Sequence, residues 1–408
     1  MAETKRRVED FEYPSEEIQQ CPYPFFEALR AECPVYSVKG RKAVQLSRYE
    51  DVAAALANWR QISSDRSWLV AQIPAEVEAV LADAWDERDV LLGEDPPSQT
   101  RHRRLVAPAF APKRIELLRD RVRAMANELI DEFAAEGRVD WVTRYANLLP
   151  ARVMTALFGV PFSDHERLTK YTEDYLDWTA KMLNPLSVER EVECAHSIVS
   201  FQRYVLERLE AMEHEPGENL FGDLVKADDI SLGVKIDIAK TMLLAGVETT
   251  RGLLGSSMKL LLEHPEQAGR VRADRTLIPA VVEESLRIES PAQRVSRWIP
   301  DGAAVPAGDL PGSHYMNLLV GSANRDERVF DRPEEFDIDR EELGKHLAFG
   351  KGVHFCIGSP LARMEGVVSL ELALERLPNL RLDGTPPAYR PNPLTRALGS
   401  LEVEWDRT

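Results

Sequence analysis

The sequence predicts a mainly α-helical protein with a small β-rich region. From about residue 115 onward, apolar residues recur mostly with helical spacing. The longest such segment, 234–263, would span roughly 45 Å at about 1.5 Å per residue, enough to cross a large domain. Short strands are expected near the N-terminus and between 298 and 345, where glycines and prolines interrupt the pattern.

The first predicted elements are two strands followed by a helix. Residues 35–38 and 43–46 are expected to form the strands, separated by a polar turn. Ser47 and Glu50 have the spacing of a capping box, in which the serine bonds forward and the glutamate bonds back. This box predicts a helix over about 48–57.

Two later helices are bounded by prolines. One is expected over about 278–289, before Pro291, because the residue preceding a proline disfavours helix. Another follows Pro360 and stops at Pro378. Its apolar residues share one face at spacings of three and four, and they are Leu361, Met364, Val368 and Leu372.

Charge and cysteine content argue against several classes of protein. The formal net charge of −17 disfavours general nucleic-acid binding. The four cysteines are scattered and form no Cys-x-x-Cys pair, which argues against a disulfide scaffold and a structural zinc site. Neither a signal peptide nor an apolar run of about 18 residues is visible, so a cytoplasmic protein is expected.

The segment 349–358 carries the strongest chemical signal. Cys356 lies just before the last long helix, where free N–H groups and the helix dipole favour a thiolate. Glycines at 350, 352 and 358 allow the backbone to approach a flat ligand closely. A thiolate that accepts backbone hydrogen bonds is the arrangement expected of a haem-ligating sulfur.

The loop allows three other interpretations. A phosphate loop needs four residues between its glycines, whereas five separate Gly344 from Gly350, and Gly352 follows the lysine instead of Ser or Thr. Zinc would need more ligands, and only His354 is close. A lone packing cysteine would be the default in a generic loop.

The loop resembles the haem-binding signature of bacterial cytochromes P450, Phe-Gly-x-Gly-x-His-x-Cys-x-Gly. It matches at every fixed position, which are Phe349, Gly350, Gly352, His354, Cys356 and Gly358. The resemblance implies that Cys356 is the proximal iron ligand and that His354 contacts a haem propionate. It also implies one cytochrome P450 domain over 15–408, after an N-terminal tail over 1–14. Haem b would lie between the long helix and the cysteine loop.

A second motif, 245–250, lies in the long helix. Glycine and adjacent threonines weaken a helix, so alone the motif fits a polar kink as well as a functional groove. Beside the cysteine loop it resembles the oxygen-binding groove of the family. The resemblance implies haem contacts for Ala245 and Gly246, and proton delivery by the acid Glu248 and the alcohol Thr249.

A third motif is Glu284-x-x-Arg287, which alone would most often be a surface ion pair. It resembles the buried structural clamp of the family. Many relatives have an arginine where Glu335 stands. The third member of the clamp is therefore either missing here or replaced by Arg340.

Further basic residues are expected to hold the haem carboxylates. Arg297 and Arg103 match the propionate-binding arginines of the family, and a guanidinium suits a carboxylate because its fork can bond both oxygens. Gln99 stands where relatives often have a histidine, and a weaker propionate hydrogen bond is expected there.

A basic surface is expected to dock an acidic ferredoxin-type partner, with a merely solvated surface as the alternative. Its predicted residues are Arg101, Arg103, Arg104, Lys113, Arg114 and Lys351, with Lys345 and Arg363 near the haem loop. Electrons would come ultimately from NAD(P)H through this partner, because no flavin or iron–sulfur segment is visible. The protein is expected to be a monomer.

The substrate is expected to be an apolar small molecule of unknown identity. By family analogy its pocket draws on Met242, Val247, Val295 and Leu394, within wider segments that include 66–92 and 171–186. Bulky contacts are suggested by Trp68, Trp85, Trp178 and Met182. Arg294 and Arg396 are interpreted as surface salt bridges rather than as anchors for an anionic substrate.

The function predicted is that of a haem-thiolate monooxygenase that inserts one oxygen atom of O2 into its substrate. Ring closure, coupling or dealkylation stays open in place of hydroxylation, and two other functions also stay open. A peroxide-driven hydroxylase would need no partner, but it would be expected to lack the Glu248–Thr249 pair. A non-enzymatic haem-thiolate sensor would not need this pair either, and it would usually bring an output domain.

Overall fold

The computed structural model describes residues 6–39, 43–65, 73–85, 90–181, 185–300 and 314–407. The chain forms two compact units. Unit 1 comprises Met1–Ser64, Ile130–Ala146 and Thr249–Thr408, and unit 2 comprises Asp65–Leu129 and Asn147–Glu248. Helices dominate both units, and every strand in the described residues belongs to unit 1. The predicted class, mainly α with a small β-rich region, is confirmed.

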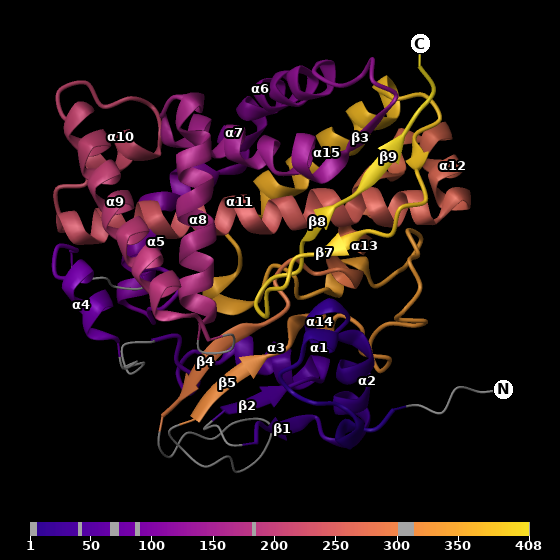
Figure 1. Ribbon diagram of the computed structural model, residues 1–408, viewed down its shortest axis with the longest axis horizontal. Coiled ribbons are helices and arrows are strands. Elements are labelled where there is room, and N and C mark those ends of the chain that lie inside the picture. Colours follow the sequence, from indigo (N-terminus) through magenta and orange to yellow (C-terminus); the bar gives the residue numbers. More distant parts are fainter. Residues whose placement is uncertain are drawn as a thin grey trace. The chain divides into compact units, whose positions relative to one another are not determined.

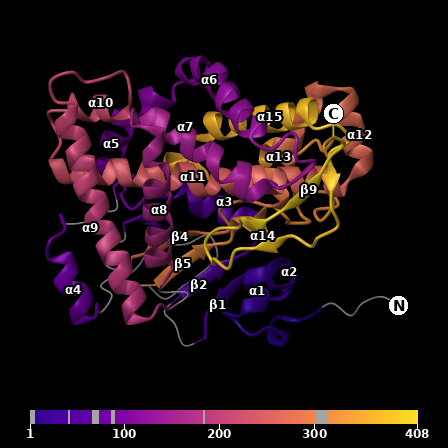
Figure 2. The same ribbon diagram turned by 45° about the horizontal axis from the view of Figure 1, so that its top comes forward.

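The described part of unit 2 consists of helices and their connections. Helix α9 packs against α8 and α4 (Figures 1 and 2). The N-terminus of α9 is capped by Ser187, whose hydroxyl accepts from the Arg190 N–H. The helices of unit 2 are α4 (Ala75–Leu81), α5 (Ser98–Val106), most of α6 (Pro112–Asp131), α7 (Leu148–Phe158), α8 (His165–Ala180), α9 (Val188–Ala211) and α10 (Leu220–Val225), with short 3-10 turns at Ala107–Phe110 and Phe162–Asp164.

The long helix α11 (Leu232–Glu263) contains the boundary between the two units, which falls between Glu248 and Thr249. The other helices of unit 1 are α1 (Glu16–Gln20), α2 (Tyr23–Glu32), α3 (Tyr49–Ala57), α12 (Pro265–Ala273), α13 (Ile278–Ile288), α14 (Val320–Ala323) and α15 (Ser359–Arg376). Short helical turns lie at Val8–Asp10, Val142–Ala146, Arg275–Leu277, Leu343–Lys345 and Gly352–His354. The predicted helices at 234–263, 278–289 and after Pro360 are confirmed to within two residues.

The described residues of unit 1 form three small sheets. The largest has the order β1-β2-β5-β4, with β2 and β5 parallel and the outer pairs antiparallel (Figure 1). The predicted strands at 35–38 and 43–46 are confirmed as its first hairpin. The strands are β1 (Val35–Ser37), β2 (Ala43–Leu46), β5 (His314–Leu318) and β4 (Val295–Ile299) in the first sheet, β3 (Arg138–Asp140), β9 (Glu402–Glu404) and β6 (Arg381–Leu382) in the second, and β7 (Ala388–Tyr389) and β8 (Leu398–Ser400) in the third.

Helix α3 begins where predicted, but its predicted capping box is wrong. The Ser47 hydroxyl donates to the carbonyl of Pro34 at 3.3 Å and makes no bond to the helix start. Instead, the first N–H of α3, from Tyr49, donates to the carboxylate of Asp326 at 2.8 Å. A carboxylate at a helix N-terminus satisfies a free donor and complements the dipole. The cap is therefore a tertiary contact.

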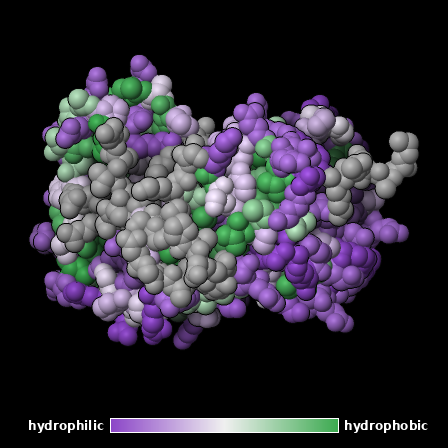
Figure 3. Space-filling model, turned by 90° about the horizontal axis from the view of Figure 1, so that it is seen from below, coloured by the Kyte–Doolittle hydropathy of each residue, from purple (hydrophilic) through white to green (hydrophobic). Residues whose placement is uncertain are grey.

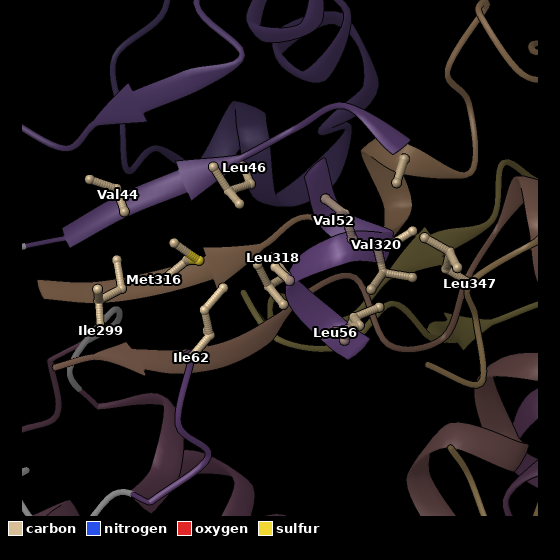
Figure 4. Packing of buried hydrophobic residues seen from close by; sticks show 13 residues of the cluster. Val44, Leu46, Val52, Leu56, Ile62, Ile299, Met316, Leu318, Val320 and Leu347 are labelled. Carbon is tan, nitrogen blue, oxygen red and sulfur yellow. The ribbon is translucent and has the colours of Figure 1, made fainter. Parts of the chain in front are cut away.

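A cluster of buried apolar residues joins the largest sheet to α3. In Figure 4, Leu46 and Leu318 from the strands lie close to Val52 and Leu56 of α3. Leu347, which precedes the cysteine loop, belongs to the same cluster and is buried. This apolar packing holds the start of the loop against the sheet and α3.

The expected N-terminal tail is partly packed. Val8, Phe11 and Tyr13 pack against a buried cluster that includes Phe25, and the rings of Tyr13 and Phe25 are stacked.

The coloured surface in Figure 3 is mostly hydrophilic (purple), with hydrophobic residues (green) in smaller groups. None of the helices in the described residues is long and apolar enough to cross a membrane.

Candidate functional site

The cysteine loop is held by backbone contacts within unit 1. The Cys356 N–H donates to the carbonyl of Phe349 at 2.8 Å, which closes the loop. Gly350 and Gly352 have φ angles of +68° and +73°, which side chains disfavour. A Cβ on Gly352 would lie 3.0 Å from the carbonyl oxygen of Leu56. Gly352 therefore allows the loop to approach the end of α3 closely.

The residues of the loop fit a haem. Cys356 is partly exposed and lies three residues before the start of α15, an 18-residue helix whose positive end favours a thiolate. In the described part of the chain, no three His, Cys, Asp or Glu side chains gather as a metal site. A cofactor that brings its own metal and needs one protein sulfur suits this donor set. Close by, the imidazole Nε2 of His354 lies 2.9 Å from the hydroxyl of Ser64.

Two side chains flank the ring of Phe349, the residue whose carbonyl accepts from the Cys356 N–H. The guanidinium of Arg363 lies 4.4 Å from the ring centroid, and the ring of His346 lies 5.9 Å from it. Glu283 of α13 binds both: its carboxylate accepts from Arg363 at 2.6 and 2.9 Å, and it lies 3.0 Å from Nε2 of His346. The sequence reasoning missed Glu283, although it directly precedes the clamp residue Glu284.

The electrostatics of Glu283 follow from these contacts. Burial raises the pKa of its carboxyl, but the hydrogen bonds with His346 and Arg363 outweigh burial and hold the pKa at about 2. The Nδ1 atom of His346 accepts from the Ala348 N–H at 3.2 Å, so Nε2 is the donor toward Glu283. Glu283 therefore stays negative at neutral pH and braces one side of the cysteine loop.

The Glu-x-x-Arg motif forms a buried ion pair in α13. Both side chains are 0% exposed, and the guanidinium of Arg287 donates twice to the Glu284 carboxylate, each time at 2.7 Å. Arg340 donates from Nε to the same carboxylate at 3.1 Å and is the third member. Glu335 takes part only through its backbone carbonyl, and its side chain pairs with Arg332 at the surface.

Asn324 connects this clamp to the cysteine loop. Its backbone carbonyl accepts from Arg287 at 2.9 Å, and its side-chain Oδ1 accepts from the Leu347 N–H at 2.7 Å. The carbonyl of Leu347 in turn accepts from the Gly350 N–H at 2.8 Å. A continuous series of hydrogen bonds thus runs from the buried ion pair to the loop that carries Cys356.

The motif 245–250 lies in α11, which is helical throughout. Glu248 is buried, Thr249 is half-buried, and Ala245 is exposed. A Cβ on Gly246 would lie 2.6 Å from Sδ of Met154, so this glycine lets α7 approach α11 within unit 2. Glu248 and Thr249 are adjacent on one helix, and the unit boundary falls between them.

The residues predicted to hold haem carboxylates lie on three elements. Gln99 and Arg103 occupy α5 of unit 2, four positions apart and thus on one helix face. Arg297 lies in β4 of unit 1, is buried, and donates to the carbonyl of Ser296 at 2.8 Å. His354 belongs to the cysteine loop.

The predicted substrate residues are placed as follows. In α11, Met242 and Val247 are buried. Val295 packs against the buried cluster of the largest sheet, and Leu394 is half-buried in unit 1. Of the bulky residues considered, Trp68 and Met182 lie outside the described residues. The backbone of Trp85 forms hydrogen bonds with the side chain of Gln202. The ammonium of Lys181 lies 3.4 Å from the ring centroid of Trp178.

Arg294 and Arg396 are buried, so the prediction of surface salt bridges is wrong. Arg396 pairs with Glu289 at 2.5 Å and lies 3.7 Å from the ring centroid of Tyr389. Arg294 donates to the hydroxyl of Tyr13 at 2.8 Å. Both side chains tie together parts of unit 1.

The predicted docking residues differ in how far they are neutralised. Arg101 pairs with Asp229 at 3.0 Å, and Arg114 pairs with Asp223 at 3.2 Å. Arg363 is bound to Glu283, as described above. Further exposed cations of the predicted set are Arg104, Lys113, Lys345 and Lys351.

Comparison with known proteins identifies the family. The family model for cytochrome P450 matches residues 16–392. The chain is 34% identical over 405 residues to the cytochrome P450 monooxygenase PikC of Streptomyces venezuelae, covering 95% of this chain and 91% of that protein. It is 34% identical over 401 residues to the 6-deoxyerythronolide B hydroxylase of Saccharopolyspora erythraea, covering 94% and 96%.

A solved structure agrees with these matches. The heme domain of CYP116B5 from Acinetobacter radioresistens superposes with a TM-score of 0.90 at 26% identity, covering 97% of each chain. The family match spans both compact units and includes the cysteine loop and the long helix. The chain belongs to the cytochrome P450 family and is a haem-thiolate monooxygenase.

Proposed function

We propose that this monooxygenase inserts one oxygen atom of O2 into an apolar organic small molecule, using electrons from a separate ferredoxin and its NAD(P)H-dependent reductase. The observation that supports this most is the Cys356 loop, closed on Phe349 and braced from α13, in a chain that matches the family over 16–392. When bound, haem b with a thiolate ligand supplies the activation of dioxygen.

The roles of this chain's residues follow from their chemistry. Cys356 would hold the haem iron as a thiolate, while the bracing contacts keep its loop closed on Phe349. Gln99, Arg103, Arg297 and His354 would hold the propionates. Buried Glu248 holds a proton and passes it by way of the Thr249 hydroxyl, which is general acid catalysis by a placed carboxyl group.

The partner would dock on exposed cations. Arg104, Lys113 and Lys351 are exposed, as are Arg101 and Lys345, and complementary charge steers an acidic partner to such residues. Replacing Arg104, Lys113 and Lys351 by glutamine should slow reduction of the protein by a plant-type ferredoxin, most strongly at low salt. An equal rate at every salt concentration would contradict this docking site.

The substrate class is proposed from the relatives. One relative is the hydroxylase of 6-deoxyerythronolide B, and another curated relative, from Bacillus subtilis, is a polyketide biosynthesis cytochrome P450. We therefore expect a polyketide-like compound to shift the haem iron from low spin to high spin. A screen that included such compounds and found the shift only with unrelated classes would correct this proposal.

The central test is carbon monoxide binding to the reduced protein. The expected result is the red-shifted Soret band of a thiolate-ligated haem, with Cys356→Ser losing it and the surface variant Cys21→Ser keeping it. A band typical of histidine ligation in the unaltered protein would contradict the role of Cys356.

Thr249→Ala should raise the peroxide released per electron consumed. Full activity with peroxide and no partner would favour the peroxide-driven alternative.

A further inference from the structure

The carboxylate of Glu283 and the guanidinium of Arg363 form a charge pair beside the loop that carries Cys356. Two hydrogen bonds join them, at 2.6 and 2.9 Å, in the side-by-side geometry that suits a guanidinium and a carboxylate. The pair links α13 to α15, the helix that starts three residues after Cys356. Because the pair is charged, it acts on this site through its electric field as well as through its contacts.

The positive member of the pair lies over the ring of Phe349. The guanidinium carbon of Arg363 is 4.4 Å from the ring centroid, within the range of a cation–π contact. The carbonyl of Phe349 accepts from the Cys356 N–H at 2.8 Å. One aromatic residue and one backbone hydrogen bond therefore connect a full positive charge to the residue proposed to bind the iron.

The negative member is the more buried of the two and has a second partner. The side chain of Glu283 is 21% exposed, against 37% for Arg363. Its Oε2 atom also lies 3.0 Å from Nε2 of His346. Among the described residues, Glu283 is the carboxylate that pairs with Arg363. Glu283 is therefore still held when Arg363 is replaced, and Arg363 is left with an uncompensated charge when Glu283 is made neutral.

The two charges have opposite effects on an electron added nearby. Reduction of a thiolate-bound iron from the ferric to the ferrous state adds one electron and moves no proton at either side chain. A positive charge close to the iron favours the added electron, and a negative charge opposes it. Charge and hydrogen bonding around a ligand are means by which a protein sets a reduction potential. An intact pair largely cancels, whereas a pair with one member removed leaves a full unit charge beside the loop.

We propose that Glu283 is a positioning residue that sets the reduction potential of the haem iron by neutralising Arg363 over the ring of Phe349. With the pair intact, Arg363 adds little attraction for the incoming electron, which comes from the ferredoxin-type partner proposed above. The inference rests on the proposed role of Cys356 as the iron ligand.

Potentiometric titration of the holoprotein with dithionite and mediator dyes tests this inference. At a fixed potential, Glu283→Gln should raise the ratio of reduced to oxidised haem at least about threefold, because the Arg363 charge is then uncompensated. Arg363→Met should lower that ratio by a similar factor, because the Glu283 charge then remains. For a one-electron couple a threefold change corresponds to about 28 mV, at about 59 mV per tenfold. Shifts of the same sign, or no shift in either variant, overturn the inference.

Further variants separate the effect of charge from that of shape. Arg363→Lys and Glu283→Asp disturb the paired geometry but keep both charges, so their potentials should stay near that of the original protein. The double variant Glu283→Gln/Arg363→Met leaves no uncompensated charge and should also return to the original potential. If all these variants shifted the potential in one direction, loosening of the loop would explain the effect and the role of charge would be refuted.

Arg376→Met is the matched control. Arg376 ends the same helix, α15, and pairs with Asp131 at 2.6 Å, with its side chain 33% exposed. It lies about 20 Å farther along the helix axis than Arg363, at about 1.5 Å per residue. Its replacement should leave the potential unchanged. A shift equal to that of Arg363→Met would show that only the net charge of the protein matters, which would overturn the inference.

The outcomes separate this inference from the proposed function. A thiolate-type carbon monoxide spectrum without the two opposite shifts would reject the role of the charge pair alone. Opposite shifts in a protein without that spectrum would reject Cys356 as the iron ligand alone.

Discussion

Glu283→Gln keeps the shape of the side chain but removes the charge that holds Arg363 and His346. The pKa of the Glu283 carboxyl is about 2 in the folded protein, against an ordinary value of 4.5. At about 1.4 kcal/mol per pH unit, this difference corresponds to about 3 kcal/mol. The Arg363 side chain is 37% exposed, so solvent screening reduces the expected loss of unfolding free energy to about 2 kcal/mol.

The pH dependence has a definite sign. A carboxyl whose pKa is depressed by folding stabilises the protein above its unfolded pKa, and this stabilisation is lost as the pH falls toward the folded pKa. The difference between the original protein and Glu283→Gln should therefore be constant from about pH 8 to about pH 6. It should be smaller by about 1 kcal/mol near pH 4.

Urea unfolding at several pH values measures this difference directly. A second measurement, the carbon monoxide spectrum during storage, should show faster loss of the thiolate band in the variant, because Arg363 and His346 flank Phe349. Glu335→Gln is the matched control, since its side-chain ion pair lies at the surface and should contribute less than about 1 kcal/mol. A difference that grows on acidification, or none at neutral pH, would refute the reasoning.

Three further predictions concern unit 1. Arg340→Met should lower the unfolding free energy by about 3 kcal/mol, because it leaves the buried Glu284 carboxylate short of a partner; a change below about 1 kcal/mol in urea would contradict the three-membered clamp. Gly352→Ala should cost about 2 kcal/mol in thermal unfolding, since its φ is positive and a backbone carbonyl of α3 lies close, whereas Gly344→Ala, in open space, should be neutral. Burial raises the pKa of Glu365 to about 8, so the original protein should lose stability as the pH rises from about 4.5 to 8. Glu365→Gln should lack this loss and be more stable near pH 8, by at most about 4 kcal/mol; parallel stability curves would disprove this.

Elements that depend on local pattern were predictable from the sequence. Helix α11 starts only two residues before the predicted boundary, because its apolar spacing is carried by its own residues. The hairpin of β1 and β2 was predictable for the same reason. The cysteine loop was recognisable because its chemistry requires particular residues at particular spacings within ten positions.

Contacts between distant parts of the chain were not predictable in this way. Ser47 looked like the cap of α3, but the capping carboxylate comes from Asp326, 277 positions away from Tyr49. Glu283 lies 63 positions from His346 and 80 positions from Arg363. One sequence contains no sign of such pairings, since a lone acidic residue beside a motif is usually solvated.

Buried charge was the other source of error. Arg396 was expected at the surface, yet Glu289 and Tyr389 surround its guanidinium in the interior. A charged residue is rarely buried unless it is paired, and the partner becomes visible only in the fold. The replacement of the missing clamp arginine by Arg340 required the fold for the same reason.

The side-chain amide of Asn324 forms hydrogen bonds with two different segments of unit 1. Its Oδ1 accepts from Leu347 and its Nδ2 donates to the hydroxyl of Ser290 at 2.7 Å, in a position that is 0% exposed. An ionised aspartate offers no donor and leucine offers neither group. Deamidation of this residue would therefore keep the acceptor for the Leu347 N–H, remove the donor to Ser290 and bury a negative charge. Aged protein that carries this aspartate should unfold at a lower urea concentration than fresh protein.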